Sequence, residues 1–136
     1  METWILKIHL FATIFMVGLV WFVQLLHYPL FHQVSLENFQ GYHQRYLRES
    51  GFLIAPVMLV EVISGSVLVF LKADLLLILN MTFLALIWLS TFLLQVPFHN
   101  RLGEQRNEQI IRKLVNSNWL RTVLWSVRGL LLLYLL

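Results

Sequence analysis

Four apolar stretches separated by polar segments form the pattern of this chain. They cover approximately residues 4–28, 52–71, 75–98 and 119–136. Because a helix of about 20 mostly apolar residues crosses the hydrocarbon core of a bilayer, each stretch predicts a transmembrane helix. Only Lys72, Ala73 and Asp74 separate the second stretch from the third, which predicts a tight antiparallel hairpin.

The two longer connections have the spacing of amphipathic helices. Ser35 is suited to cap a helix over residues 36–49, and residues 104–116 place Ile110, Ile111 and Leu114 on one side. Each connection either lies on the membrane interface or extends the following helix beyond the bilayer. The pattern therefore predicts an all-α integral membrane four-helix bundle, a single transmembrane domain over residues 1–136, with two polar helical connections on one face.

A weak internal repeat accompanies this pattern. Near the end of a span each half carries similar residues, namely Gln24, His27 and Pro29 in the first half and Gln95, Pro97 and His99 in the second. An amphipathic segment and another span follow in both halves. Two such halves would be related by a pseudo-twofold axis along the membrane normal. The alternative is that proline and histidine simply favour helix ends at interfaces.

Composition narrows the class of protein. The chain has 136 residues, 59% hydrophobic and 12% charged, and its mean hydropathy of +0.74 excludes a soluble domain. The absence of cysteine excludes disulfides, iron–sulfur clusters and thiolate metal sites. The net charge of +3 is explained by cations that flank the membrane, so nucleic acid is not an expected partner. The first apolar stretch lacks a basic leader and a cleavage site, so we expect it to be retained.

Successive spans run in opposite directions through the membrane. Many polar and aromatic residues are therefore expected at one end of the bundle, here called the histidine face. Its members are His27, His32, Tyr42, His43, His99, Asn118, Trp119 and Arg121. Most cations belong to the same side, namely Arg45, Arg48, Arg101, Arg106, Arg112, Lys113 and Arg121. The positive-inside rule then places the histidine face in the cytoplasm and both termini outside an inner membrane.

Glu61 and Arg128 lie in the middle of two apolar stretches. Each lies nine residues beyond the start of its stretch, and both stretches begin at the histidine face. Both charges should therefore lie about 14 Å below that face. An ionisable group at this depth is costly unless it is paired, so we expect a buried pair that either fixes the helix register or belongs to a site. Arg121, two turns before Arg128, continues a basic stripe suited to an anionic head group.

The histidines suggest cofactor chemistry. His27, His43 and His99 together, without thiolates, would suit Cu, Fe or Zn, or two of them would ligate haem. Gln24 and Gln95 lie three and four residues from His27 and His99, which predicts that each amide orients a ring. The alternative is that these histidines only cap helix ends at the interface.

Aromatic residues make up 14% of the chain, and many suit the belts at membrane interfaces. The belt residues expected are Trp4 and Tyr134 on one side, and Tyr28 and Trp119 on the other. Trp21, Trp88 and Trp125 lie deeper, where they line a pocket for a flat ring or pack the core. On the histidine face, the candidate cofactor-binding residues are Gln24, Gln95, Trp119 and Tyr42.

The C-terminal third contains a longer pattern. It reads Gln95-Val96-Pro97-Phe98-His99-Asn100-Arg101-Leu102, then Asn118-Trp119-Leu120-Arg121-Thr122, with Trp125 and Arg128. This pattern resembles the ending of small four-helix membrane proteins of the anthrone oxygenase type. The resemblance implies oxygenation of a polycyclic phenolic or related apolar substrate, and it extends to Asn100, Arg101, Asn118, Arg121 and Arg128. With Glu61 added for its depth, the candidate catalytic residues are Glu61, Asn118, Arg121 and Arg128.

The first span also has a family resemblance. Trp4-Ile5-Leu6-Lys7-Ile8-His9, with Gly18-Leu19, is similar to the first helix of membrane-bound, haem-containing protoporphyrinogen oxidases. That resemblance covers one helix and implies a role for its histidine, His9. By position alone, His9 lies at the end opposite the histidine face, where we expect a hydrogen-bonded interfacial residue.

Three classes of function follow. We expect a membrane-embedded oxidoreductase or oxygenase that acts on an apolar aromatic or lipid-like substrate, with a site opening on the histidine face and a buried Glu–Arg pair. The alternatives are a non-catalytic haem-binding or metal-binding membrane protein and a structural subunit of a larger complex. The expected partners are the lipid bilayer and a small apolar or aromatic ligand. Gly65, between Ser64 and Ser66, offers a small-residue face that would also suit a homo-oligomer.

Overall fold

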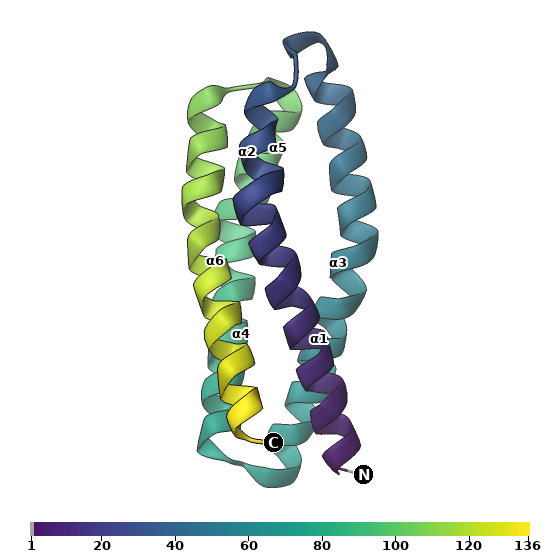
Figure 1. The fold of residues 1–136 in the computed structure, drawn as a ribbon, viewed down its shortest axis with the longest axis vertical. Helices are drawn as coiled ribbons and strands as arrows, with labels where there is room; N and C mark the ends of the chain where they lie inside the picture. Colours follow the sequence, from purple (N-terminus) through teal and green to yellow (C-terminus); the bar gives the residue numbers. More distant parts are fainter. Residues whose placement is uncertain (1) are drawn as a thin grey trace.

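Four long antiparallel helices make up the computed structural model, which describes residues 2–136 (Figure 1). The first is built from α1 (Glu2–Phe22), the π-helical turn η1 (Val23–His27), α2 (Tyr28–Leu30) and the 3-10 turn η2 (Phe31–Gln33). The second is α3 (Leu36–Lys72). The third consists of α4 (Leu75–Ser90), the π-helical turn η3 (Thr91–Gln95) and α5 (Val96–Glu104), and the fourth is α6 (Glu108–Tyr134). No strand occurs among the described residues, so the predicted all-α helical bundle is confirmed.

The connections divide between the two ends of the bundle. The links before α3 and before α6 lie at one end, whereas the link between α3 and α4 lies beside both termini at the other (Figure 1). At the first end, Arg106 donates to the backbone carbonyl of His32 at 2.8 Å, and Glu108 binds both Arg106 and His32. These contacts join the two connections, so the histidine face is one continuous surface.

Both polar connections extend the helix that follows them. α3 has 37 residues, which corresponds to about 55 Å, whereas a hydrocarbon core is about 30 Å thick. Residues 36–51 therefore reach beyond the apolar part of α3. α6 begins at Glu108 because Asn107 caps it, its side-chain oxygen accepting from the backbone N–H groups of Gln109 and Ile110. Ser35 occupies the N-cap position of α3, but its hydroxyl accepts from the side chain of Asn38 and not from the backbone.

Each half of the chain contains a π-helical turn that ends two residues before a proline. Pro29 follows η1, and Pro97 follows η3. A proline ring lacks an N–H group and collides with the carbonyl four residues earlier. The backbone changes to bonds that span five residues just before each proline, as from Tyr28 N–H to the carbonyl of Val23. The two halves therefore share a backbone irregularity, which agrees with the weak repeat.

Three of the four long helices are apolar and long enough to cross a membrane, namely Glu2–Gln33, Leu36–Lys72 and Leu75–Glu104. This chain is an integral membrane protein of the helical type. The mean hydropathy of α6 is lower than that of these three helices because it carries Asn118, Arg121 and Arg128. All three of these side chains are buried inside the bundle. The prediction of a fourth span therefore stays a prediction.

Apolar side chains cover the outside of the bundle. Phe70 is 89% exposed and Phe52 is 77% exposed, as suits a surface that faces lipid. Inside, α1, α3 and α4 approach closely at Gly65, where an added Cβ would collide with Met81 and would lie 2.8 Å from Cε1 of His9. The small-residue face around Gly65 thus serves contacts within one chain.

Candidate functional site

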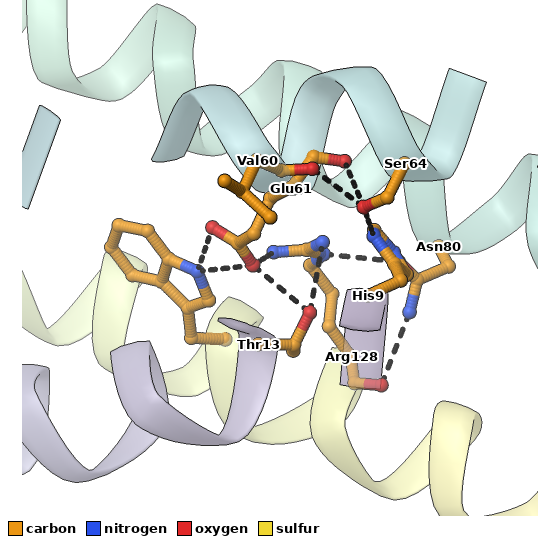
Figure 2. Close-up of polar contacts among 8 residues, drawn as sticks. His9, Thr13, Val60, Glu61, Ser64, Asn80 and Arg128 are labelled. Atoms are coloured by element: carbon orange, nitrogen blue, oxygen red, sulfur yellow. Dashed lines mark hydrogen bonds and ion pairs between the residues drawn. The ribbon is translucent and has the colours of Figure 1, made fainter. Parts of the chain in front are cut away.

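Glu61 and Arg128 form a fully buried ion pair inside the bundle (Figure 2). Arg128 Nη1 lies 2.5 Å from Glu61 Oε1, and both side chains are 0% exposed. The same carboxylate accepts from the hydroxyl of Thr13 at 3.0 Å and from the indole N–H of Trp125 at 3.2 Å. α1, α3 and α6 therefore meet at one carboxylate, and the predicted pairing at equal depth is confirmed.

A second layer of hydrogen bonds surrounds this pair. The side-chain oxygen of Asn80 accepts from Arg128 Nε at 3.2 Å, and its amide nitrogen donates to the backbone carbonyl of Arg128. His9 lies 2.9 Å from the hydroxyl of Ser64 and 3.4 Å from the Asn80 oxygen. We call these residues the Glu61–Arg128 centre: His9, Thr13, Glu61, Ser64, Asn80, Trp125 and Arg128. None of their buried polar atoms lacks a partner.

The expectation of an interfacial His9 is wrong. Its side chain is 1% exposed and belongs to the Glu61–Arg128 centre. Two signals in the sequence could have indicated this. Thr13 lies one helical turn after His9 on the same face, and Asn80 is a polar residue six positions into the mainly apolar stretch 75–98. Polar residues on the faces of neighbouring spans at one depth predict a shared cluster.

Nearer the histidine face, a cavity of about 380 Å³ opens between the helices. This volume lies within the range of small-molecule sites. Its wall is mainly apolar and comes from α1, η1, α2, α3, α4, η3, α5 and α6. The principal apolar lining residues are Met16, Val20, Val23, Ile54, Met58, Trp88 and Phe92. The polar lining residues include Tyr28, Tyr46, Gln95, His99, Asn118 and Arg121.

A hydrogen-bonded chain starts at the polar end of the cavity. The phenol oxygen of Tyr28 lies 3.1 Å from His99 Nε2, and His99 Nδ1 lies 3.0 Å from His43 Nε2. Tyr28 and His99 line the cavity, whereas His43 lies behind them, stacked on Phe39. His43 belongs to the part of α3 beyond its apolar stretch, and burial lowers its pKa from the usual 6.5, so that it is neutral at pH 7. This chain of neutral groups can pass a proton away from the cavity.

The predicted three-histidine metal site is not formed. Among residues 2–136, no group of three or more His, Asp or Glu side chains has a geometry that could hold a metal ion. Both ring nitrogens of His99 are engaged by Tyr28 and His43, while His27 stacks on Tyr46 with ring centroids 4.2 Å apart. His43 and His99 are together as expected, but they bind each other. These three histidines therefore do not form the predicted site for Cu, Fe or Zn, and we propose no metal or haem for this protein.

Arg121 is the second buried arginine, and its environment differs. Its side chain is 7% exposed and lines the cavity. Within the part of the chain that the structure describes, no carboxylate lies within 4.0 Å of it, and its Nε atom has no hydrogen-bond partner. The guanidinium carbon lies 5.2 Å from the ring centre of Trp125, which separates it from Glu61. A buried cation without an anion is unfavourable unless a ligand completes its environment.

Two amides at the cavity have orientations set by the backbone. The carbonyl of Val115 can only accept, so the Gln24 group that faces it is the NH2 group, at 3.1 Å. The Gln24 oxygen therefore accepts from Asn118 Nδ2 at 2.9 Å, which leaves the Asn118 oxygen buried without a partner. Gln24 thus orients Asn118 and not His27, contrary to the prediction.

The orientation of the Gln95 amide is fixed in a similar way. The hydroxyl of Ser117 donates to the carbonyl of Leu114 at 3.2 Å, so its oxygen accepts from Gln95 Nε2 at 2.9 Å. The Gln95 oxygen is then buried without a partner. The indole N–H of Trp88, a further lining residue, is also buried and unpartnered. Among the residues that line the cavity, two donors, on Arg121 and Trp88, and two acceptors, on Gln95 and Asn118, are therefore buried without a partner.

The remaining predicted site residues lie outside the cavity lining. Trp119 is 41% exposed and packs edge-on against Trp21, and Tyr42 is an exposed residue beside His27. Glu61 and Arg128 belong to the saturated centre described above. Of the predicted catalytic set, the cavity therefore brings together Asn118 and Arg121. Sequence reasoning placed Tyr28 in an interfacial belt, but this side chain is 3% exposed and binds His99.

No protein-family model, curated protein or solved structure matches this chain.

Proposed function

We propose that this protein is a membrane-embedded oxidoreductase or oxygenase that acts on an apolar aromatic or lipid-like substrate bound in the cavity. The observation that carries the proposal is Arg121, a buried cation without a carboxylate partner at the polar end of an otherwise apolar pocket. A substrate oxygen would accept from Arg121 and would gain acidity from its charge. The apolar wall would hold the ring system and exclude water.

The chain of Tyr28, His99 and His43 supplies the acid–base part of the proposal. Tyr28 would take the proton of a substrate hydroxyl while its own proton passes to His99 Nε2, and the His99 Nδ1 proton passes to His43. Arg121 would then hold the resulting oxyanion. The ionised ring is the electron-rich form that an oxidant attacks.

The oxidising half of the proposal comes from the resemblance to the anthrone oxygenase type. With dioxygen as the oxidant, a ring CH2 group would become a carbonyl group, and the second oxygen atom would leave as water. This reaction needs no bound metal when the substrate anion itself reduces dioxygen. The residues proposed for it are Arg121 and Asn118 at the substrate oxygen and Tyr28 as the base, with His99 and His43 as the proton relay behind it. Glu61 and Arg128 hold the helices.

Anthrone is a suitable probe for the test. Protein purified into lipid nanodiscs should consume dioxygen and form anthraquinone faster than empty nanodiscs do, and Arg121→Met should abolish the difference. Arg112→Met, which changes an exposed arginine of the same helix, is the matched control and should be active. If the wild-type protein neither binds nor oxidises anthrone or simple phenols, the enzyme proposal is wrong and a structural role is favoured.

We also propose an inner membrane, with the histidine face toward the cytoplasm and α6 as a fourth span. The excess of arginine and lysine at that face supports this orientation. Cysteines introduced at Ser35 and Glu104 should react with a membrane-impermeant reagent only after the membrane is opened. A cysteine introduced at Asp74 should react in intact cells. The opposite labelling would reverse the orientation, and labelling of all three from one side would contradict the four-span arrangement.

A further inference from the structure

A groove between α3 and α4 adjoins the cavity. It has a volume of about 470 Å³ and is lined by Leu59, Val62, Met81, Leu84, Ala85 and Trp88. Trp88 lines the cavity as well, and Met58 of the cavity wall precedes Leu59 of the groove. The groove follows α4 from Trp88 to Met81, which corresponds to about 10 Å along the helix axis. Trp88 therefore borders both the cavity and this groove, whose lining residues are all apolar.

Hydrogen bonding in the cavity limits the chemistry of the head group. The free oxygens of Gln95 and Asn118 are acceptors, because backbone carbonyls fix the orientation of both amides. A carboxylate or a phosphate diester would satisfy Arg121 but has no proton to donate to these oxygens. A phenol can accept from Arg121 and donate to Asn118, which lies three residues earlier on the same helix face. A second hydroxyl group on the ring would donate a hydrogen bond to the side-chain oxygen of Gln95.

We propose that the ligand is a ring with at least two hydroxyl groups and one hydrocarbon chain, a lipid-tailed hydroquinone. The ring occupies the cavity, and the chain lies in the groove between α3 and α4. The inference rests on the proposed function for the head group and adds the tail and the hydroxyl groups. The ligand enters sideways from the bilayer between these two helices, so it never leaves the apolar phase.

Decyl-hydroquinone is the probe for the tail, and unsubstituted hydroquinone is its tailless counterpart. Binding is measured by isothermal calorimetry on the full-length protein in nanodiscs, with partition into empty nanodiscs subtracted. The decyl compound should bind at least tenfold more tightly than hydroquinone. Ala85→Phe, which fills the groove, should remove that gain and leave hydroquinone binding unchanged. Thr82→Phe, on the exposed side of α4, is the matched control and should retain the gain.

The hydroxyl groups have a separate probe. The dimethyl ether of decyl-hydroquinone keeps the oxygens and the tail but has no donors, so it should bind at least tenfold more weakly, because Gln95 and Asn118 then stay unsatisfied. Decanoic acid has the same tail with a carboxylate head and should also bind weakly. Equal binding of decanoic acid and decyl-hydroquinone would overturn the assignment of a hydroxylated ring.

The outcomes separate this inference from the proposed function. If hydroquinone and its decyl form bind equally and Ala85→Phe has no effect, the tail is wrong while the cavity function stands. If no probe binds, or if Arg121→Met binds all of them as the wild type does, the proposed function fails and the inference fails with it. Val62→Phe fills the groove from α3, so the result does not depend on whether Ala85→Phe folds.

Discussion

Two buried arginines lie seven residues apart on α6, and their surroundings are opposite. Arg128 binds Glu61 and Asn80 within a centre whose buried polar atoms all have partners. Arg121 has no carboxylate, and its Nε atom is unpartnered beside a cavity. The first arrangement is complete within the protein, whereas in the second a buried cation lacks a carboxylate partner. Buried charge alone is therefore a poor guide to function, and the degree of hydrogen-bond satisfaction is a better one.

This difference also changes the roles of the predicted residues. The sequence alone predicts that Arg121 and Arg128 form a basic stripe on one helix face, which leads to the buried acid Glu61. In the structure, Trp125 divides that stripe, since its indole N–H binds Glu61 and its ring lies beside Arg121. The Glu61–Arg128 centre joins helices, whereas Arg121 lines the cavity in which we propose that a ligand binds.

The largest expected effect comes from breaking the saturated centre. Glu61→Leu leaves Arg128 buried without an anion, which should lower the free energy of unfolding by about 3–5 kcal/mol. The double variant Glu61→Leu/Arg128→Met removes both charges and should cost about 1–3 kcal/mol, because Thr13 and Trp125 still lose an acceptor. Unfolding by denaturing detergent, followed by circular dichroism, measures both. Equal losses in the single and double variants would show that the pair is not coupled.

Gly65 tests how tightly the same centre is built. In Gly65→Ala the new Cβ would lie 2.8 Å from Cε1 of His9, which Ser64 and Asn80 hold in place. We expect a net loss of about 1–2 kcal/mol in the free energy of unfolding, since overpacking exceeds the gain in helix propensity. Gly41→Ala is the control, because nothing lies within 4 Å of its added Cβ. A stabilised Gly65→Ala variant would mean that the centre adapts to extra volume.

The comparison also shows how far the sequence can be read. Counting residues from the ends of the apolar stretches was enough to place Glu61 and Arg128 at one depth, because depth in an ideal helix depends only on position. The bundle and the end that gathers the histidines follow from the same count. These features need no knowledge of how each helix is rotated about its axis.

Features that depend on how each helix is rotated about its axis could not be predicted by counting residues. Gln24 and His27 were assigned to one face from a spacing of three residues, but both lie in the π-helical turn η1, where regular α-helical spacing does not apply. Gln24 turns to α6 instead and binds Asn118. The lack of a carboxylate partner for Arg121 could not be predicted from the sequence either. An unpaired charge is recognised only when the positions of all neighbouring side chains are known.

Removal of Arg121 contrasts directly with removal of Arg128. Arg121→Met should change the free energy of unfolding by less than about 1 kcal/mol, because the loss of its contact with the Trp125 ring is offset by the loss of an unpaired buried charge. Decyl-hydroquinone should raise the unfolding midpoint of the wild type and not of this variant. A decrease in the free energy of unfolding as large as that of Glu61→Leu would show that Arg121, like Arg128, stabilises the fold.

The smallest expected effect is on the pH dependence of stability at the cavity side. Burial lowers the pKa of His43 below its usual 6.5, so the unfolded chain binds more protons than the folded chain once the pH falls below that value. Stability should therefore fall on acidification from pH 7.5 to pH 5. His99 from α5 faces His43 directly, and Arg106 lies over the Phe39 ring on which His43 stacks.

His43→Gln isolates this contribution, because glutamine can still hydrogen bond to His99 but does not titrate. The loss of unfolding free energy between pH 7.5 and pH 5 should be smaller in the variant than in the wild type. Denaturing-detergent titrations at four pH values measure it. Parallel profiles for the two proteins would show that His43 accepts a proton in the folded state as easily as in the unfolded chain.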